Sequence, residues 1–277
     1  MSAPVAVTIA GSDSSGGAGI EADLKTFSAL GVYGAAIITA LTAQNTKGVF
    51  GIHQVPADFI VSQINAVFTD LDVSAVKIGM LGDVSAIDVV AAALDRYRPR
   101  HVVLDPVMIA SSGERLLRED AVGHLRELAR RVHLLTPNLP EAAALLDAPL
   151  ARDEEEMQAQ AERLLALGAG AVLIKGGHGG GPESVDLLVE SKAAKKTATE
   201  PPARTYRRFA TPRVATRNTH GSGCTLASAI AAGLAKGLSM ERAIGDGKAY
   251  VSAAIAAADR LNVGSGRGPL HHFYAWW

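Results

Sequence analysis

Short runs of apolar residues alternate along the chain with longer segments in which apolar residues recur every three or four positions. The run VAVTIA at residues 5–10 predicts a buried strand, and the spacing of Ile20, Leu24, Phe27 and Leu30 predicts a helix that ends at Gly31. Further strands are predicted at residues 36–39, 75–78, 101–104, 132–135 and 172–174. Helices are predicted between them at residues 59–68, 84–94 and 121–128, just after 138, and at 157–165. This alternation predicts a mainly parallel sheet covered by helices on both faces, because each parallel step needs a crossover.

The pattern changes after residue 183. Residues 187–189 and 206–209 predict a small antiparallel hairpin, and the polar stretch 192–203 between them predicts an exposed loop. Two alanine-rich helices, at 223–236 and from 240 to 261, follow the hairpin. Because the chain shows no internal repeat and no obvious linker, we expect one doubly wound α/β domain over residues 1–277.

Composition and charge exclude several classes of protein. The chain has 27 basic and 28 acidic residues, so its charge gives no reason to expect a nucleic-acid or anionic-membrane partner. A single cysteine excludes an intrachain disulfide and a cysteine-based zinc site. The N-terminus lacks the basic region of a signal peptide, and glycines and amides interrupt the uncharged stretch 26–46. We therefore expect a soluble, cytoplasmic protein.

The first candidate for chemistry is the segment GSDSSGGAG at residues 11–19. It follows a predicted strand and opens a helix, which would leave free backbone N–H groups that a ligand can approach closely. It does not match the dinucleotide-binding pattern G-x-G-x-x-G. A flexible turn with Asp13 bonded to its own backbone is an equally good interpretation.

Three more predicted strands end at charged or polar side chains, where ligands of parallel sheets bind. Asp105 suits a site for Mg²⁺ and phosphate, although a turn-forming role is also open. Asn138 and Glu141 have the spacing of a helix capping box and equally that of a metal–phosphate site. Lys175, beside two glycines, suits a nucleotide phosphate, although a lysine at a strand end is ordinarily a solvated rim residue.

The sharpest element is NTHGSGCT at residues 218–225, a glycine turn that opens a long apolar helix. The N–H groups of Gly221, Ser222, Gly223 and Cys224 are expected to converge on an anion, which the helix dipole also favours. A helix N-terminus commonly lowers the pKa of a thiol, which would make Cys224 reactive. The alternative is an inert, buried cysteine.

Two other side chains could bind the aromatic ring of a substrate. Gln44 can donate and accept together and so match the edge of an aminopyrimidine, or it could cap a turn. Met80 would form an adaptable apolar wall or part of the core. The aromatic end HHFYAWW at residues 271–277 is interpreted as packing or as an oligomer contact.

Taken in order, these blocks closely resemble the hydroxymethylpyrimidine/phosphomethylpyrimidine kinases of thiamine biosynthesis, within the ribokinase-like superfamily. The resemblance covers nearly the whole chain, and several blocks in order are far more specific than any one of them. The blocks lie at residues 8–13, 15–25, 39–46, 77–80 (KIGM), 105–108 (DPVM), 136–141 (TPNLPE), 175–178 (KGGH) and 218–225.

The resemblance implies phosphorylation of 4-amino-5-hydroxymethyl-2-methylpyrimidine by ATP, then of its monophosphate. By the same resemblance the pyrimidine site would contain Gly11, Asp23, Gln44, Met80 and Val107. Asp105 and Glu141 would support Mg²⁺, Asn138 and Lys175 would face ATP phosphates, and the turn from Gly221 to Cys224 would stabilise the transferring phosphoryl group. A homodimer is expected on the same basis.

Two positions depart from the pattern expected by resemblance. Ser14 stands where proline is expected, which would loosen the turn, and Cys224 stands where the wider superfamily places an aspartate base. A thiol can deprotonate a hydroxyl acceptor, whereas a phosphate acceptor is already ionised and needs no base. We therefore expect Cys224 to matter mainly for the first phosphorylation.

Three other functions remain open. A pyridoxal kinase would share the architecture and the chemistry, and Gln44 is the residue that best discriminates it from a pyrimidine kinase. A non-catalytic pyrimidine-binding protein is disfavoured because Lys175, Cys224 and the glycine turn are all present. A nicotinamide oxidoreductase is disfavoured because the first strand lacks the dinucleotide pattern.

Overall fold

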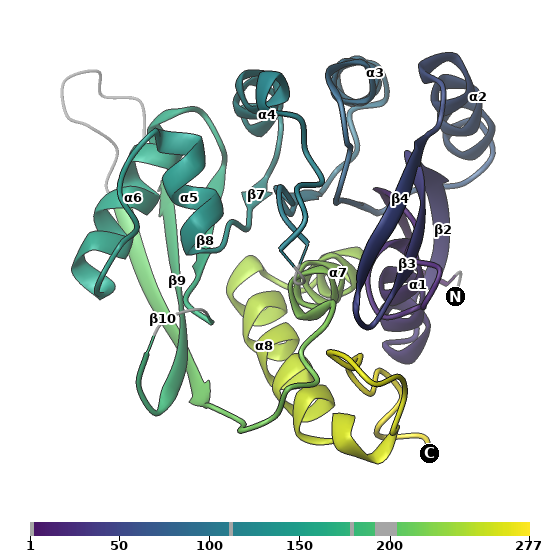
Figure 1. Cartoon of the computed structure of the whole chain (residues 1–277). Coiled ribbons are helices and arrows are strands. Elements are labelled where there is room, and N and C mark those ends of the chain that lie inside the picture. Colours follow the sequence, from purple (N-terminus) through teal and green to yellow (C-terminus); the bar gives the residue numbers. More distant parts are fainter. Residues whose placement is uncertain (1–2, 111–112, 178–179, 192–203) are drawn as a thin grey trace, which may run out of the picture.

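A computed structural model describes residues 3–110, 113–177, 180–191 and 204–277 of the chain. Its centre is an eight-stranded sheet with the order β10-β9-β8-β7-β6-β5-β1-β2 (Figure 1). Six strands of this sheet, in the order β8-β7-β6-β5-β1-β2, pair in parallel, whereas β9 and β10 are antiparallel additions at one edge. The strands of this sheet are β1 (Val5–Ala10), β2 (Tyr33–Ile38), β5 (Ala75–Ile78), β6 (Val102–Leu104), β7 (Leu134–Leu135), β8 (Ala171–Lys175), β9 (Glu183–Ser191) and β10 (Arg204–Pro212).

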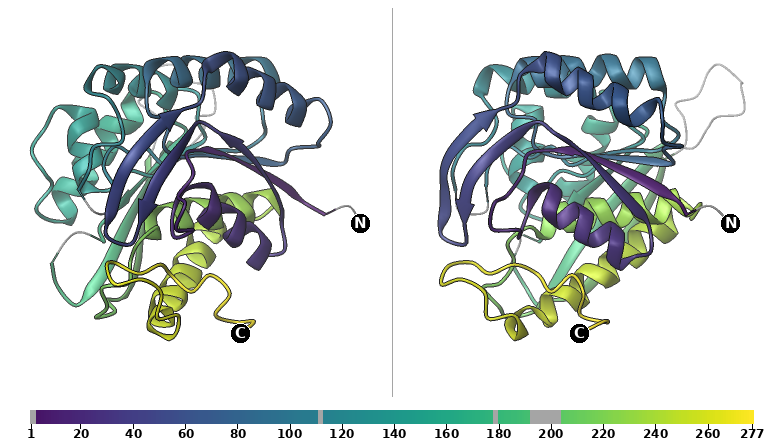
Figure 2. Two further views of the ribbon diagram at one scale, coloured as in Figure 1. Left: turned by 45° about the vertical axis from the view of Figure 1, so that its right-hand side comes forward. Right: turned by 90° about the vertical axis from the view of Figure 1, so that its right-hand side faces the viewer.

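Helices cover both faces of the sheet (Figure 2). One face packs against α2 (Ala57–Phe68), α3 (Val84–Tyr97), α4 (Val122–Ala129), α5 (Leu139–Leu146) and α6 (Glu154–Ala166). The other packs against α1 (Gly19–Ala29), α7 (Ser222–Ala235) and α8 (Met240–Ala256). Two short 3₁₀ helices, Glu119–Ala121 and Ala258–Arg260, complete the helical segments.

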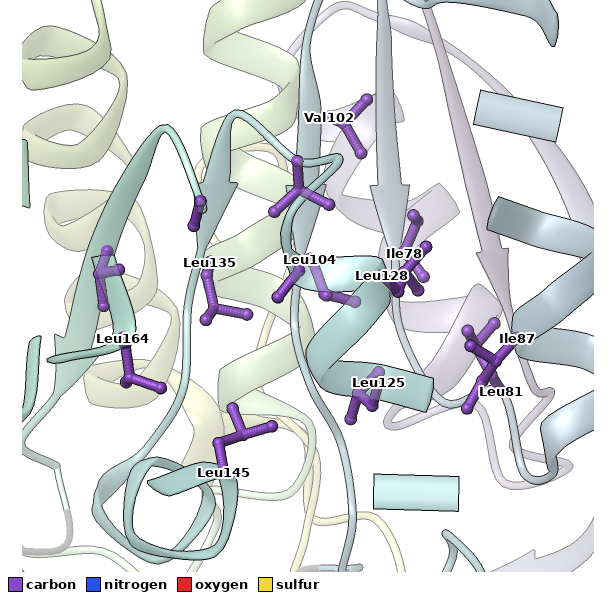
Figure 3. Close-up of a cluster of buried hydrophobic side chains, with 14 of the residues drawn as sticks. Ile78, Leu81, Ile87, Val102, Leu104, Leu125, Leu128, Leu135, Leu145 and Leu164 are labelled. Carbon is purple, nitrogen blue, oxygen red and sulfur yellow. The ribbon is translucent and has the colours of Figure 1, made fainter. Parts of the chain in front are cut away.

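The two helical layers follow from the alternation of side chains along each strand. In β6, Val102 and Leu104 point into the core beneath α3 and α4, where Figure 3 shows them among the surrounding leucines, whereas Val103 belongs to the core beneath α7. A strand that is buried on both faces needs apolar residues at consecutive positions. The α/β class, the parallel sheet and the C-terminal hairpin predicted from the sequence are therefore confirmed.

The periodicity missed one element and misjudged the extent of others. Strands β3 (Ala40–Asn45) and β4 (Gly48–Gln54) form a separate antiparallel hairpin with a bulge at Ala43/Gln44. Buried and exposed residues alternate along β3, and most of β4 is exposed, so the hairpin leaves no continuous apolar run in the sequence. Strand β2 begins earlier than predicted and β7 spans only Leu134–Leu135. The predicted loop at 192–203 and His178 lie outside the described residues.

Within the part of the chain that the structure describes, no helix is both long enough and apolar enough to span a bilayer.

Candidate active site

The site lies where the sheet changes its winding direction. Strand β1 has β2 on one side and β5 on the other, so the chain leaves β1 and β5 in opposite directions, and ligands of open α/β sheets bind beyond the carboxyl ends of the strands at such a point. Gly11 follows β1, and its N–H donates to the carbonyl oxygen of Met80 at 3.1 Å. A Cβ on Gly11 would lie 2.5 Å from Cε of Met80, so a larger residue here would displace the end of the Met80 side chain. Gly11 and Met80 thus lie next to each other beyond the carboxyl ends of β1 and β5.

A lysine–carboxylate cluster gathers at the ends of three neighbouring strands. Lys175, at the end of β8, places Nζ 2.5 Å from Oδ1 of Asp105, which follows β6, and 3.9 Å from Oε2 of Glu141 in α5. All three side chains are buried. Burial raises the pKa of the Glu141 carboxyl to about 7, although the neighbouring Lys175 ammonium acts to lower it. The carboxylates raise the pKa of Lys175 despite its burial, so its ammonium stays charged.

The two interpretations of Asn138 and Glu141 are compatible. The Asn138 side chain accepts from the Glu141 backbone N–H at 2.9 Å, and Oε2 of Glu141 accepts from the Asn138 N–H at 2.8 Å. This reciprocal pair is a complete capping box at the start of α5. It also fixes the Glu141 carboxylate next to Lys175, so the cap positions the charged cluster.

The glycine turn before α7 faces this cluster. Gly221 is the N-cap residue with φ of 80°, and a Cβ there would lie 1.9 Å from the carbonyl oxygen of Gly17. A Cβ on Gly223 would lie 3.2 Å from Nζ of Lys175, which places the start of the helix directly beside the ammonium. The expected set of four free N–H groups needs one correction, because the Ser222 N–H already donates to the carbonyl oxygen of Thr219 at 3.2 Å.

The expected low pKa of Cys224 is wrong. Burial raises the pKa of its thiol to about 11, although the Lys77 ammonium and the Gly19 N–H act in the opposite direction. The rule for helix N-termini assumes that solvent or a cation stabilises the thiolate. Here desolvation dominates, and the neutral thiol prevails near neutral pH.

The side chain of Asp23, for which the resemblance implied a contact with the pyrimidine, is bonded to other groups of the protein. Its side chain is fully buried beneath the site. Its Oδ2 accepts from Oγ1 of Thr8 at 2.6 Å and from Nζ of Lys77 at 2.7 Å, and its Oδ1 accepts from Oγ of Ser228 at 2.6 Å. This carboxylate neutralises the buried Lys77 ammonium, whose pKa it raises against the effect of burial.

A hydrogen bond between Asp13 and His220, which no sequence motif predicted, joins the two glycine turns. Asp13 Oδ2 lies 2.8 Å from Nε2 of His220, and it also accepts from the N–H groups of Gly17 and Ala18. Oδ1 accepts from the N–H and hydroxyl of Ser15, so the predicted local turn around Asp13 is present as well. These hydrogen bonds lower the pKa of Asp13 to about 2, although burial opposes the shift.

Gln44 lies in β3 of the β3–β4 hairpin, and its side chain projects toward His220. Its Nε2 lies 3.4 Å from Nε2 of His220, and its Oε1 accepts from Oγ1 of Thr42 at 3.2 Å. The amide is partly exposed, as is Val107, which follows the β6 end. The structure therefore brings Gln44 to the same histidine that binds the glycine-rich turn at 11–19.

A parallel sheet with a lysine–carboxylate cluster and a glycine-capped helix at its carboxyl edge defines a small-molecule kinase of the ribokinase-like class. Solved structures of kinases have the same fold. Bacillus subtilis pyridoxal kinase in complex with ADP superposes with a TM-score of 0.88 at 33% identity over 99% of both chains. A phosphomethylpyrimidine kinase from Clostridium difficile has a TM-score of 0.76 at 42% identity over 91% of this chain and 99% of that one.

The sequence comparisons identify the family within this class. The profile described as phosphomethylpyrimidine kinase matches residues 13–271. Hydroxymethylpyrimidine/phosphomethylpyrimidine kinases from Rhizobium meliloti and Escherichia coli are 53% and 50% identical, covering 99% and 98% of this chain and 98% of each relative. The chain belongs to the phosphomethylpyrimidine kinase family and is a phosphotransferase, so the family and enzyme class predicted from the sequence are confirmed.

Proposed function

We propose that this enzyme uses ATP to phosphorylate 4-amino-5-hydroxymethyl-2-methylpyrimidine and then phosphorylates the resulting monophosphate to the diphosphate, within thiamine biosynthesis. The observation that carries the proposal is the meeting of the Lys175–Asp105 pair with the glycine turn before α7, in a chain of this family. Phosphoryl transfer needs positioning and charge neutralisation more than covalent chemistry, and these groups supply both.

Lys175 and the α7 turn would act on the transferring phosphoryl group. The Lys175 ammonium is held by Asp105, so it can neutralise phosphate charge without reorganising. The N-terminus of α7 adds backbone N–H groups and the positive end of the helix dipole. Asn138 would contribute to phosphate binding in two ways. It caps α5 and so fixes Glu141, and it lies beside Lys175.

Asp105 and Glu141 fit a role in holding Mg²⁺ together with the nucleotide. Within the described residues no group of three or more histidine, cysteine, aspartate or glutamate side chains could hold a metal alone. Mg²⁺ in kinases usually takes one or two carboxylates plus substrate phosphates and water, so these two side chains are sufficient. The bound ion supplies charge neutralisation on the phosphates.

The pyrimidine would lie between the hairpin and the first glycine turn. The Gln44 carboxamide can donate to a ring nitrogen and accept from the exocyclic amino group, while Gly11, Met80 and Val107 supply the surrounding walls. The His220 ring, which is bonded to Asp13, lies next to this amide. Cys224 would act as base on the hydroxymethyl acceptor of the first step through the small thiolate fraction that its raised pKa leaves, whereas the phosphate acceptor of the second step is already ionised.

Pyridoxal is the second candidate acceptor. The favouring observation is the close superposition on Bacillus subtilis pyridoxal kinase, at 33% identity. The family match and the two relatives near 50% identity make the pyrimidine the main substrate of the proposal. A homodimer and a cytoplasmic location belong to the same proposal.

Product analysis tests the assignment. The enzyme is incubated with the hydroxymethylpyrimidine and excess Mg²⁺–ATP, and the products are resolved by liquid chromatography and mass spectrometry. We expect the monophosphate to appear first and to convert to the diphosphate. The Lys175→Met variant serves as the control for contaminating kinases. Failure of the wild-type enzyme to form either product contradicts the proposal.

A further inference from the structure

The C-terminal segment 264–269 lies between two turns that are far from it in sequence. Figure 2 shows the yellow C-terminal segment running beneath the ends of β3 and β4, and Figure 1 shows it below the start of α7. The sequence of this segment is GSGRGP, with glycine at every second position. We call residues 264–269 the bridging segment.

The bridging segment binds the hairpin turn through its backbone. The Gly266 N–H donates to Oγ1 of Thr46 at 3.1 Å, and the Arg267 N–H donates to the Thr46 carbonyl oxygen at 2.8 Å. Thr46 is two residues beyond Gln44, at the turn between β3 and β4. The end of the hairpin that carries Gln44 is therefore fastened to the C-terminal segment.

The same segment binds the turn that precedes α7. The Gly268 N–H donates to Oδ1 of Asn218 at 3.0 Å, and the Gly268 carbonyl oxygen accepts from the His220 N–H at 3.1 Å. His220 also pairs with Pro269 in a parallel bridge. Gly221 follows directly, so these bonds fix the residue that leads into the phosphoryl-binding turn.

The glycines of the bridging segment are required by these close contacts. A Cβ would lie 2.4 Å from Oγ1 of Thr46 at Gly264, 2.0 Å from the Thr46 carbonyl oxygen at Gly266, and 2.4 Å from Oδ1 of Asn218 at Gly268. The nearest atom at Gly266 is backbone, which cannot swing away as the end of a side chain can. Alanine at 266 must therefore move the segment away from the hairpin turn.

We infer that residues 264–269 are a positioning segment of the active site, which holds the Gln44 hairpin at a fixed distance from the phosphoryl-binding turn. The inference rests on one part of the proposed function, namely that Gln44 contacts the pyrimidine ring of the acceptor. The pyrimidine ring and its phosphoryl donor bind to different elements, so their relative placement depends on whatever joins those elements. A displacement of about 1 Å between reacting groups can cost about 100-fold in rate.

Steady-state kinetics of Gly266→Ala test the inference. We expect kcat for the pyrimidine to fall about tenfold or more and its KM to rise, while the KM for ATP changes less than about twofold, because the lysine cluster is not attached to the hairpin. Gly123→Ala is the matched control, since a Cβ there meets nothing within 4 Å and the residue lies on the exposed side of α4. Unchanged kcat and KM for the pyrimidine, or equal rises in both KM values, would overturn the inference.

Thr46 provides a second pair of variants that does not force a clash. Thr46→Ala removes the oxygen that accepts from Gly266, and Thr46→Ser keeps it. The loss of one such bond predicts a rise of about fivefold in the pyrimidine KM for the alanine variant and recovery for the serine variant. The same rise in both variants would contradict the role of this hydrogen bond.

Hydrogen–deuterium exchange separates this inference from the proposed function, because it needs no substrate. Amides of residues 40–54 should exchange faster in Gly266→Ala than in the wild-type enzyme and in Gly123→Ala, while amides of α3 stay unchanged. Unchanged exchange in residues 40–54 would overturn the positioning role even if the pyrimidine is phosphorylated. If the wild-type enzyme does not phosphorylate the pyrimidine, this result contradicts the proposed function but not the positioning role of residues 264–269.

Discussion

Replacing Asp23 by asparagine tests whether this carboxylate is a structural counter-charge or a contact to substrate. The side chain is fully buried, and its oxygens accept from Thr8, Lys77 and Ser228 at 2.6–2.7 Å. Removal of one partner from a buried ion pair typically costs about 3–5 kcal/mol, because the remaining charge stays buried. For a chain of this size that corresponds to a fall in Tm of about 6–20 °C.

Urea unfolding and acceptor kinetics measure the two possible effects of Asp23→Asn separately. We expect a large loss in the free energy of unfolding, with a pyrimidine KM close to that of the wild type under conditions where the variant is folded. Adding Lys77→Met should recover part of the loss, because the uncompensated ammonium is then removed as well. Gln44→Ala is the contrasting control and should raise the pyrimidine KM with little change in stability. Wild-type stability together with a raised pyrimidine KM for Asp23→Asn would refute the structural role.

Three further predictions concern the phosphoryl-transfer groups. Cys224→Ala should slow the first phosphorylation about 100-fold more than the second, and equal losses for the two acceptors would contradict a role as base. Lys175→Met should lower kcat at least about 100-fold while calorimetry still detects pyrimidine binding, and a matching loss of pyrimidine binding would argue against its role at the phosphates. Burial raises the pKa of Glu141 from 4.5 to about 7, so folding favours its protonated form. The stability that this residue contributes is present below the unfolded pKa and lost as pH rises through about 7. Urea unfolding of Glu141→Gln across this range should show a smaller decline with pH than the wild type, and an identical decline would exclude Glu141 as its source.

The parallel sheet could be predicted because its strands are buried on both faces and leave continuous apolar runs. The β3–β4 hairpin could not, because it is not part of the main sheet and several of its side chains, Phe50 among them, are exposed. Gln44 was nevertheless singled out, since an amide stands out in an otherwise apolar stretch. Its neighbour His220 lies 176 residues away, and local periodicity carries no information about such a contact.

Burial sets the environment of two residues near the site, Asp23 and Cys224. Asp23 lies four residues before Phe27 on the buried face of α1, so helical spacing could have placed it in the core. Its partners Lys77 and Ser228 come from distant segments, and only the fold brings them together. For Cys224, the helix N-terminus was visible in the sequence, whereas the desolvation that raises the thiol pKa depends on the packing of segments distant in sequence.

The preference among acceptors tests the central claim most directly. A coupled assay of ADP release gives kcat/KM for the hydroxymethylpyrimidine, its monophosphate and pyridoxal, with wild-type enzyme and Gln44→Ala measured side by side. We predict that both pyrimidines exceed pyridoxal for the wild type, and that Gln44→Ala lowers kcat/KM for the pyrimidines more than for pyridoxal. Pyridoxal as the best acceptor, with the pyrimidines turned over poorly, would contradict the account.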